Sequence, residues 1–248
     1  MEREILDINV NLNDKAGSGF SDGSKYAAGY DDGHATGYDD GKRAESKRFW
    51  DAYQENGERT DYSYAFAGSG WNDATFLPLY KAKPQFAQGM FKNSILTNSQ
   101  DLNVVDFSEC VDLTECFAWS AFTDLPFIDM RNACDSTERM LEGAATLRVG
   151  IKVDAGVTYM NTFHLAHNLT TLSVVGQIGQ TINLQYSKLD AASALSVVSA
   201  LVNLFDDGNE YAHTLTLNSE TWAHLEGRAA PDGNTWEEYI VETLGWEI

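Results

Sequence analysis

Leu169-Thr-Thr-Leu-Ser-Val174 is one of four copies of an apolar-x-x-apolar-x-apolar unit in this chain of 248 residues. The other copies lie earlier in the chain, at Leu102/Val105/Phe107, Phe122/Leu125/Phe127 and Ala144/Leu147/Val149. An apolar pair precedes each copy, at Met90-Phe91, Cys116-Phe117, Met140-Leu141 and, in weaker form, Thr162-Phe163. The copies recur every 20–25 positions or so, and one such unit cannot bury its own apolar face, whereas stacked units form a continuous core. The pattern therefore predicts an α/β solenoid of short parallel strands. The alternative is an ordinary α/β domain whose strands recur by chance.

The residues after the repeats predict further short elements and an end cap. We expect strands over 182–186 and 214–218, a helix over 187–204, a helical turn over 219–225 and a last helix over 235–244. Thr235 and Glu238 have the spacing of a capping box at the start of that last helix. Residues 206–248 carry ten carboxylates against Arg228 alone, which fits the polar end cap that a solenoid needs for solubility.

The N-terminal part has two patterns of its own. Residues 4–12 alternate apolar and polar side chains, which predicts a half-buried strand that pairs with another chain. Further on, glycines recur at every fourth position beside two tyrosines, at Gly29, Gly33, Gly37, Gly41, Tyr30 and Tyr38. Positions i and i+4 share one stripe of a helix, although each glycine costs about 1 kcal/mol there relative to alanine. We therefore predict close helix packing and oligomerisation through these residues; a flexible glycine linker is the alternative.

These patterns divide the chain into three parts. Residues 1–48 form the strand and glycine-rich helix, for attachment and oligomerisation. Residues 49–89 are an aromatic-rich segment that caps the N-terminal end of the repeats. Residues 90–248 hold the repeats and the C-terminal cap.

Charge and composition exclude several classes of protein. The formal net charge is −20, from 17 basic and 37 acidic residues, which argues against a nucleic-acid partner. No run of apolar residues is long enough to span a bilayer, and the first residues show no secretory signal, so we expect no membrane insertion. The three cysteines have no metal-ligand spacing and are expected in the core.

No catalytic, cofactor or metal site stands out. The sequence has no phosphate-binding loop, nucleophile elbow or dinucleotide fingerprint, so we expect no enzyme and no cofactor. His164 and His167 are close in the sequence but have no partner at ligand spacing, and a structural or exposed role is favoured. The Asp-Asp-Gly units at residues 31–33 and 39–41 lack the ligand spacing of a calcium loop and are typical of solvated turns.

The repeat unit resembles the leucine-rich repeats of BspA-like proteins. The segments Arg48-Phe-Trp-Asp-Ala-Tyr-Gln-Glu-Asn-Gly57, Ala65-Phe-Ala-Gly-Ser-Gly-Trp71 and Phe76-Leu-Pro-Leu-Tyr80 are similar to a family of prophage-encoded leucine-rich-repeat proteins of gut Firmicutes. The resemblance runs from about residue 26 to the end of the chain. It implies a protein of the virion, associated with the tail or baseplate, and it brings no enzymatic activity with it.

Three functions are compatible with these observations. The first is a non-enzymatic phage structural protein, made in the host cytoplasm and carried on the virion. Its N-terminal region would assemble it as a homo-oligomer, such as a trimer, with other virion proteins. Its repeats would bind a protein or glycan of the host surface through the residues predicted to face the concave side, Asp106, Pro126, Arg148 and Ser173. The alternatives are a BspA-like bacterial adhesin and a hydrolase of envelope polymers.

Overall fold

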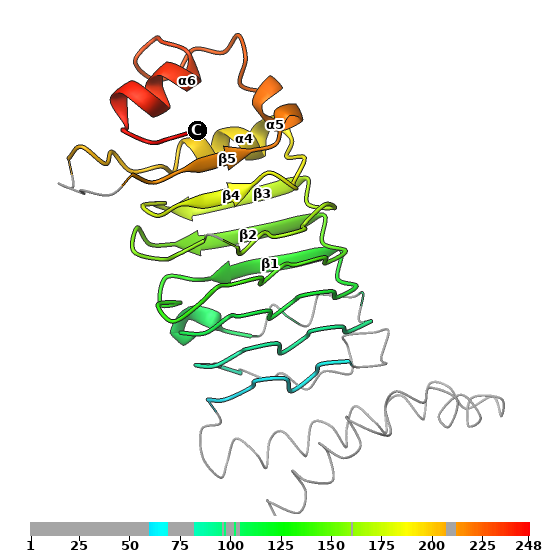
Figure 1. Cartoon of the computed structure of the whole chain (residues 1–248). Helices are drawn as coiled ribbons and strands as arrows, with labels where there is room; N and C mark the ends of the chain where they lie inside the picture. Colours follow the sequence, from blue (N-terminus) through cyan, green and yellow to red (C-terminus); the bar gives the residue numbers. More distant parts are fainter. Residues whose placement is uncertain are drawn as a thin grey trace, which may run out of the picture.

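Figure 1 shows the computed structural model of the chain, a stack of short strands and turns with helices at its C-terminal end. The structure describes residues 60–68, 82–95, 97, 102, 105–159, 161–206 and 212–248. The predicted strand over 4–12 lies outside the described residues. The same holds for the predicted oligomerisation residues Gly29, Gly33, Gly37, Gly41, Tyr30 and Tyr38, and for both Asp-Asp-Gly units.

The described part is mixed α/β, as the sequence predicts, with short parallel strands in two small sheets. The first sheet joins β1 (Asp124–Asp129), β2 (Arg148–Val153) and β3 (Thr171–Gly176) in that order. The second joins β4 (Ile182–Leu184) to β5 (Leu215–Leu217). All three strand pairs are parallel, so each strand is followed by a crossover before the chain returns to the sheet.

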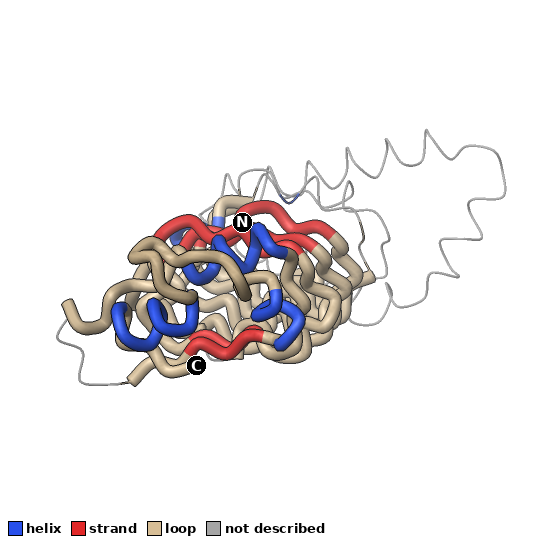
Figure 2. Tube along the Cα trace, turned by 90° about the horizontal axis from the view of Figure 1, so that it is seen from above, coloured by secondary structure: helices blue, strands red, loops and turns tan. Residues whose placement is uncertain are grey.

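Before β1 and between the strands of the first sheet, the chain forms a second layer that we call the turn ribbon. It consists of consecutive turns at 63–68, 88–93, 114–119, 138–143 and 161–165. Single parallel bridges join its first four rows at nearly even intervals, from Asp61 to Phe86, Asp112 and Ser136. The layer continues into the second sheet, because Tyr159 forms a parallel bridge to Ile182 of β4. Seen from above, strands lie on opposite sides of the stack (Figure 2).

The hydrogen bonds explain how the turn ribbon holds a stack together. Alternate N–H groups close i to i+3 turns; the Met90 N–H, for example, donates to the Ala87 carbonyl at 3.1 Å. The N–H groups between them donate to the next row, as Phe91 does to the Cys116 carbonyl at 2.8 Å. Both sets of backbone donors are thus satisfied, one within each row and one between rows.

Side chains from both layers fill the space between them. All eight residues of the predicted apolar pairs from Met90 to Phe163 are buried, which confirms that part of the repeat pattern. Phe66, Phe91 and Phe117 stack from row to row with ring centroids 5.4 Å apart and interplanar angles of 11° and 9°. Thr137 brings a polar group into this core, where its Oγ1 bonds the Thr158 carbonyl at 2.6 Å and the Thr162 hydroxyl at 2.5 Å.

The last strand of the first sheet has a helix packed along its outer edge. Helix α4 (Ala191–Val198) begins at Asp190, whose carboxylate accepts the Ser193 N–H at 2.8 Å, and it packs on β3. Ser193 and Ser196 accept the outward N–H groups of Leu172 and Val174, each at 2.9 Å. The unpaired edge of β3 is therefore covered by helix side chains, which prevents it from pairing with another strand.

Short helices complete the C-terminal end, much as predicted. They are α5 (Ser219–Ala223), α6 (Trp236–Glu238) and the π-helix η4 (Tyr239–Thr243). The predicted capping box is confirmed, since Thr235 accepts the Glu238 N–H and the Glu238 carboxylate accepts the Thr235 N–H. Trp246 is buried beneath them, and its indole N–H donates to the Val202 carbonyl at 2.9 Å.

The strand register corrects part of the predicted repeat. Asp124, Arg148 and Thr171 lie side by side, so Val149 is equivalent to Leu125 and Leu172. The predicted third repeat unit is therefore shifted by two residues relative to the others. Leu147, which was predicted to face inward, is exposed. Phe127 was also predicted to face inward and is half exposed, because the register of β1 shifts between Asp124 and Phe127. Such a bulge turns the side chains after it to the other face.

Candidate functional site

The solvent side of β1, β2 and β3, which we call the strand face, is the candidate recognition surface. The register places three rows across it. The first row is Asp124, Arg148 and Thr171; the second is Phe127, Gly150 and Ser173; the third is Asp129, Lys152 and Val175. The row that contains Phe127 therefore lies between two rows that contain charged residues.

Phe127 is the largest apolar side chain on this face, and 50% of its surface is exposed. Its ring lies across Gly150 of the next strand, where an added Cβ would stand 2.6 Å from the Phe127 Cδ1 and Cε1 atoms. Gly150 is buried as a result. The ring is thus fixed by β2 on one side and open to a partner elsewhere.

The charged residues of the first row form an ion pair. Arg148 donates from Nε to the Asp124 carboxylate, and this bond lowers the pKa of Asp124 below its usual range. At the far side of the row, the Thr171 hydroxyl donates to Asp190 Oδ2 at 3.1 Å. The row is a prearranged set of donors and acceptors on an otherwise flat strand surface.

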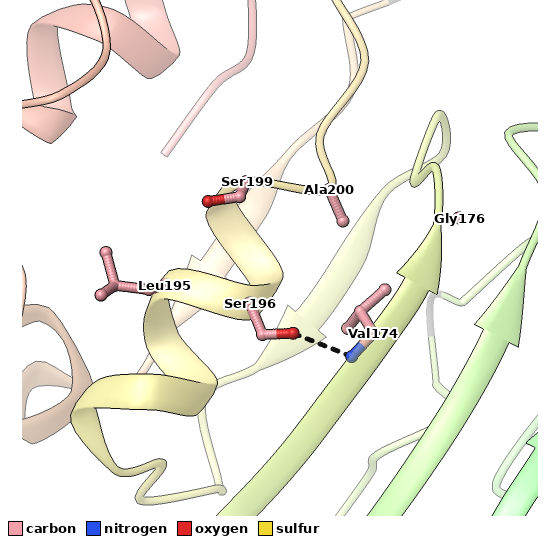
Figure 3. A pocket seen from close by; sticks show the side chains of 6 residues that line it. All are labelled: Val174, Gly176, Leu195, Ser196, Ser199 and Ala200. Carbon is pink, nitrogen blue, oxygen red and sulfur yellow. Dashed lines mark hydrogen bonds between the residues drawn. The ribbon is translucent and has the colours of Figure 1, made fainter.

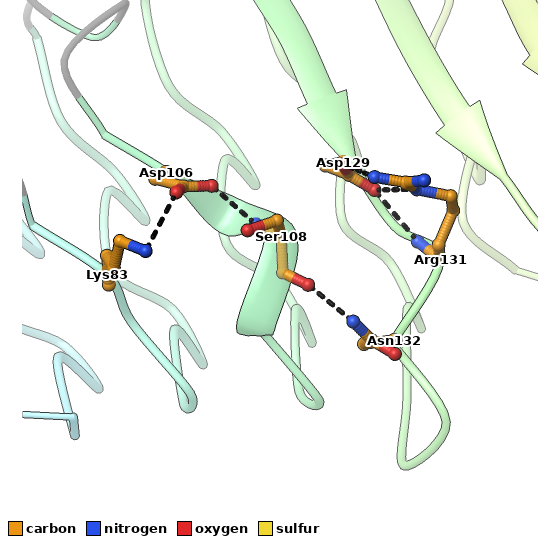
Figure 4. Close-up of polar contacts among 6 residues, drawn as sticks. All are labelled: Lys83, Asp106, Ser108, Asp129, Arg131 and Asn132. Carbon is orange, nitrogen blue, oxygen red and sulfur yellow. Dashed lines mark hydrogen bonds and ion pairs between the residues drawn. The ribbon is translucent and has the colours of Figure 1, made fainter.

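The third row has a stronger pairing at the carboxyl end of β1. Arg131 donates from Nε and Nη2 to the two carboxylate oxygens of Asp129, at 2.9 and 2.6 Å (Figure 4). These bonds lower the pKa of Asp129, whose side chain is only 10% exposed. Lys152 lies next to Asp129 on β2 and is exposed. A carboxylate held in this way stays ionised at neutral pH and is a poor proton donor.

The same edge continues toward the N-terminal coils (Figure 4). Asp106 caps the short 3-10 helix η3 (Phe107–Glu109) by accepting the Ser108 N–H at 3.0 Å, and hydrogen bonding from Ser108 lowers its pKa. Lys83 approaches the Asp106 carboxylate at 3.4 Å, and Asn132 donates to the Ser108 carbonyl at 2.5 Å. These contacts tie neighbouring coils together.

The four predicted surface residues lie in different places. Arg148 and Ser173 are exposed on the strand face but belong to adjacent rows. Pro126 is half-buried within the β1 bulge, and Asp106 is half-buried at the cap of η3. The structure therefore brings Arg148 and Ser173 near Phe127 and Gly150, two residues that the sequence pattern does not predict on this surface. Pro126 could have indicated from the sequence that β1 is irregular here, since proline inside a strand marks a bulge or an edge strand.

An open hollow of about 350 Å³ lies where β3 meets α4 (Figure 3). Its lining is Val174, Gly176, Leu195, Ser196, Ser199 and Ala200. The Ser196 hydroxyl is already bonded to the Val174 N–H, and none of these side chains is ionisable. The hollow offers small apolar and hydroxyl groups but no acid, base or charged group.

Cys110 and Cys116 are buried as predicted, whereas Cys134, also expected in the core, is exposed. Two of the described histidines contact neighbouring side chains. His164 Nδ1 lies 3.3 Å from Glu142 Oε1, and both His164 and His167 meet the ring of Tyr186 edge-on. Burial raises the pKa of the Cys110 thiol to about 12. Within the described ranges, no group of three or more His, Cys, Asp or Glu residues could hold a metal ion.

The comparisons with known proteins add no relative. No family model, curated protein or solved structure matches this chain. In the part of the chain that the structure describes, no helix has the length and apolarity needed to cross a bilayer. The site is therefore interpreted from its own geometry.

Proposed function

We propose that this protein is a non-enzymatic recognition protein that binds a surface partner through its strand face. The observation that carries the proposal is Phe127, half exposed and supported by Gly150 between two rows of charged residues. Interface residues that contribute most to affinity are often rigid aromatic or arginine side chains within a polar rim. Phe127 provides such an anchor, and Arg148, Lys152 and Ser173 provide the rim.

The stacking of the coils supports a repeat architecture of the leucine-rich type. Equivalent positions recur at nearly even intervals, both among the strands of the first sheet and among the rows of the turn ribbon. Each coil buries its apolar pair against its neighbours. We therefore interpret residues 90–248 as a leucine-rich-repeat-like solenoid with a C-terminal cap, preceded by an aromatic-rich cap at 49–89.

The place of the protein on a virion rests on its resemblance to prophage-encoded repeat proteins. In this proposal residues 1–48 attach the protein to a tail or baseplate as a homo-oligomer, and the repeats face a protein or glycan of the host envelope. Mass spectrometry of purified particles tests this part. Detection in the particle at structural abundance supports it, and absence from particles that infect normally overturns it.

The binding surface has a separate test. The full-length protein carrying Phe127→Ala should bind intact host cells about tenfold or more weakly than the wild type, because the anchor of the surface is gone. Lys152→Glu should also weaken binding by changing the charge of the rim. The matched control is Phe205→Ala, which removes a side chain that is 65% exposed in the C-terminal region.

Circular dichroism would confirm that each variant is folded. Undiminished cell binding by folded Phe127→Ala and Lys152→Glu would show that the strand face is not the recognition surface. An equal loss with Phe205→Ala would show that the effect is not specific to this face.

A further inference from the structure

One N–H group at the outer edge of β3 has no acceptor among the described residues, and it faces the hollow beside α4. Along a strand, successive N–H groups point to alternate sides, so every second one points away from β2. Three N–H groups of this series are bound, those of Leu172 to Ser193, of Val174 to Ser196 and of Ile178 to the Ala200 carbonyl, at 2.8 to 2.9 Å. The Gly176 N–H lies between the last two, and it donates no hydrogen bond within the described part of the chain.

The carbonyl of Val174 faces the same gap. In a planar trans peptide group the carbonyl and the following N–H point in opposite directions. The Val174 N–H points outward to Ser196, so the next N–H, that of Val175, points toward β2 and the Val174 carbonyl points outward. This carbonyl accepts no hydrogen bond from the residues that the structure describes. One backbone acceptor and one backbone donor thus lie on either side of Val175 at an open part of the edge.

The gap exists because α4 ends before it can cover the whole edge. Ser193 and Ser196 are about one turn apart, and Ser199 follows at the same spacing. Ser199 is the C-cap of the helix, however, and its N–H donates to the Leu195 carbonyl at 3.0 Å as the helix ends. The hollow of about 350 Å³ lies between Ser199 and Gly176, where a third serine would otherwise bond the edge (Figure 3). Gly176 brings no side chain that could fill it, and an added Cβ there would overlap a carbonyl oxygen of β2.

This arrangement matches the hydrogen bonds of one peptide residue. In parallel pairing, a residue donates its N–H to one carbonyl of the neighbouring strand and accepts the N–H that lies two residues further along that strand. The Val174 carbonyl and the Gly176 N–H are such a pair. The lining has no ionisable side chain to hold an ion, whereas Leu195 and Ala200 offer apolar walls to neighbouring side chains of a peptide. The bound residue would lie opposite Val175, whose 53% exposed side chain it would cover.

We propose that this gap, which we call the edge slot, binds one residue of a peptide segment of a partner protein. The N–H of that residue donates to the Val174 carbonyl, and its carbonyl accepts the Gly176 N–H. Hydrogen bonds to α4 and to residues 200–202 occupy the edge on either side. A whole strand therefore cannot enter, and the partner presents this residue at a bend or at a chain end. The slot adjoins the strand face at Val175 but does not depend on the proposed role of Phe127.

Heteronuclear NMR of the isotope-labelled full-length protein, titrated with N-acetyl-valine methylamide, tests the proposal. This probe is a single residue that carries both peptide groups. We expect a saturable shift of the Gly176 amide resonance and a dissociation constant of about 1–10 mM, because two hydrogen bonds and few other contacts hold the probe. N-acetyl-N-methylvaline methylamide lacks the N–H that the Val174 carbonyl accepts, and it should bind about fivefold or more weakly.

Three variants locate the site. Ser199→Leu fills the slot with a larger side chain and should weaken probe binding by about fivefold or more. Ala192→Leu, a comparable enlargement at an exposed position near the start of α4, should leave the affinity unchanged, and so should Phe127→Ala on the strand face.

The comparison of the two probes needs no variant, so it decides the question even if Ser199→Leu does not fold. Absence of a Gly176 shift at about 50 mM probe, well above the expected dissociation constant, would overturn the proposal. Equal binding of the N-methylated probe, full binding by folded Ser199→Leu, or loss of binding with Ala192→Leu or Phe127→Ala would do the same.

Discussion

Among the residues that the structure describes, three half-exposed aromatic side chains lie across a glycine of the next coil. The pairs are Tyr64 with Gly89, Trp119 with Gly143 and Phe127 with Gly150, and the aromatic residues are 50%, 52% and 50% exposed. The glycines have no side chain that would lift the ring away from the backbone. Each pair therefore joins two coils through a contact that an alanine would disrupt.

This contact predicts that alanine substitution costs more stability at Gly143 than at Gly68, although both glycines have a left-handed backbone in the turn ribbon. Gly143→Ala should be destabilised by the left-handed backbone, about 1–2 kcal/mol, and by displacement of the Trp119 ring, about 1–3 kcal/mol more. Gly68→Ala has the same backbone conformation but no atom within 4 Å of the added Cβ, so only the first cost applies. Urea denaturation of both variants measures the difference. Equal free energies of unfolding would show that the ring does not rest on Gly143.

The sequence allowed some of these residues to be predicted and hid others. Paired apolar residues such as Met90-Phe91 were correctly assigned to the core, because two adjacent buried residues recur in the four rows from 88–93 to 161–165. Phe127 was assigned inward because alternation along a strand was assumed, and the bulge at Pro126 breaks that alternation. The glycine partners could not be paired with their aromatics, since the interval between left-handed positions is not constant along the ribbon. Pairing needs the register, which only hydrogen bonding between coils determines.

At the scale of elements, helix α4 is the structure that ends the first sheet. A helix was predicted over 187–204, and the observed helix is shorter, from Ala191 to Val198. Ser193 and Ser196 replace the next strand by accepting the Leu172 and Val174 N–H groups. Serine is a common residue in many settings, so its spacing alone could not indicate that it accepts bonds from a strand edge.

Removing the hydroxyls of Ser193 and Ser196 should lower the free energy of unfolding, because two N–H groups at the edge of β3 lose their acceptors. In Ser193→Ala/Ser196→Ala the Leu172 N–H, which is buried, loses its acceptor, and we expect a loss of about 1–3 kcal/mol in unfolding free energy. Alanine favours helix more than serine does, so helix propensity works against this loss. Chemical denaturation measures the change, and Ser199→Ala, at the exposed C-cap position of the same helix, is the control. A double variant as stable as the control would refute the capping role.

For the whole molecule, charge acts on stability in two opposing ways. The net charge of −20 disfavours the compact state, and this repulsion weakens as the pH falls toward the isoelectric point near 4.4. Asp106, Asp124 and Asp129 have pKa values lowered by their hydrogen-bond partners in the folded state. In acid the unfolded chain therefore binds more protons than the folded one, and the stability from these pairs is lost as the pH falls through their folded pKa values.

We expect the urea midpoint to hold or rise from about pH 7 to pH 5 and to fall below about pH 4. Asp129→Asn should lose stability at neutral pH, and its difference from the wild type should shrink in acid, where Asp129 is protonated in both states. Asp135→Asn, at an exposed position on the same stack, should show no such trend. A constant difference for Asp129→Asn across this range would contradict the role of the Arg131 pair.

Ser193 and Ser196 cap the outer edge of β3 and so close the C-terminal edge of the first sheet to further strands. A coil adds its strand by offering N–H and carbonyl groups to the next, and at β3 two of these N–H groups are already bound within the chain. No further strand can therefore pair at this edge, and a coil can be added to the first sheet only on the other side of β3, each coil adding about 4.8 Å to the height of the stack. The C-terminal end carries no copy of the repeat unit, and it fixes where the stacked strands of the first sheet finish.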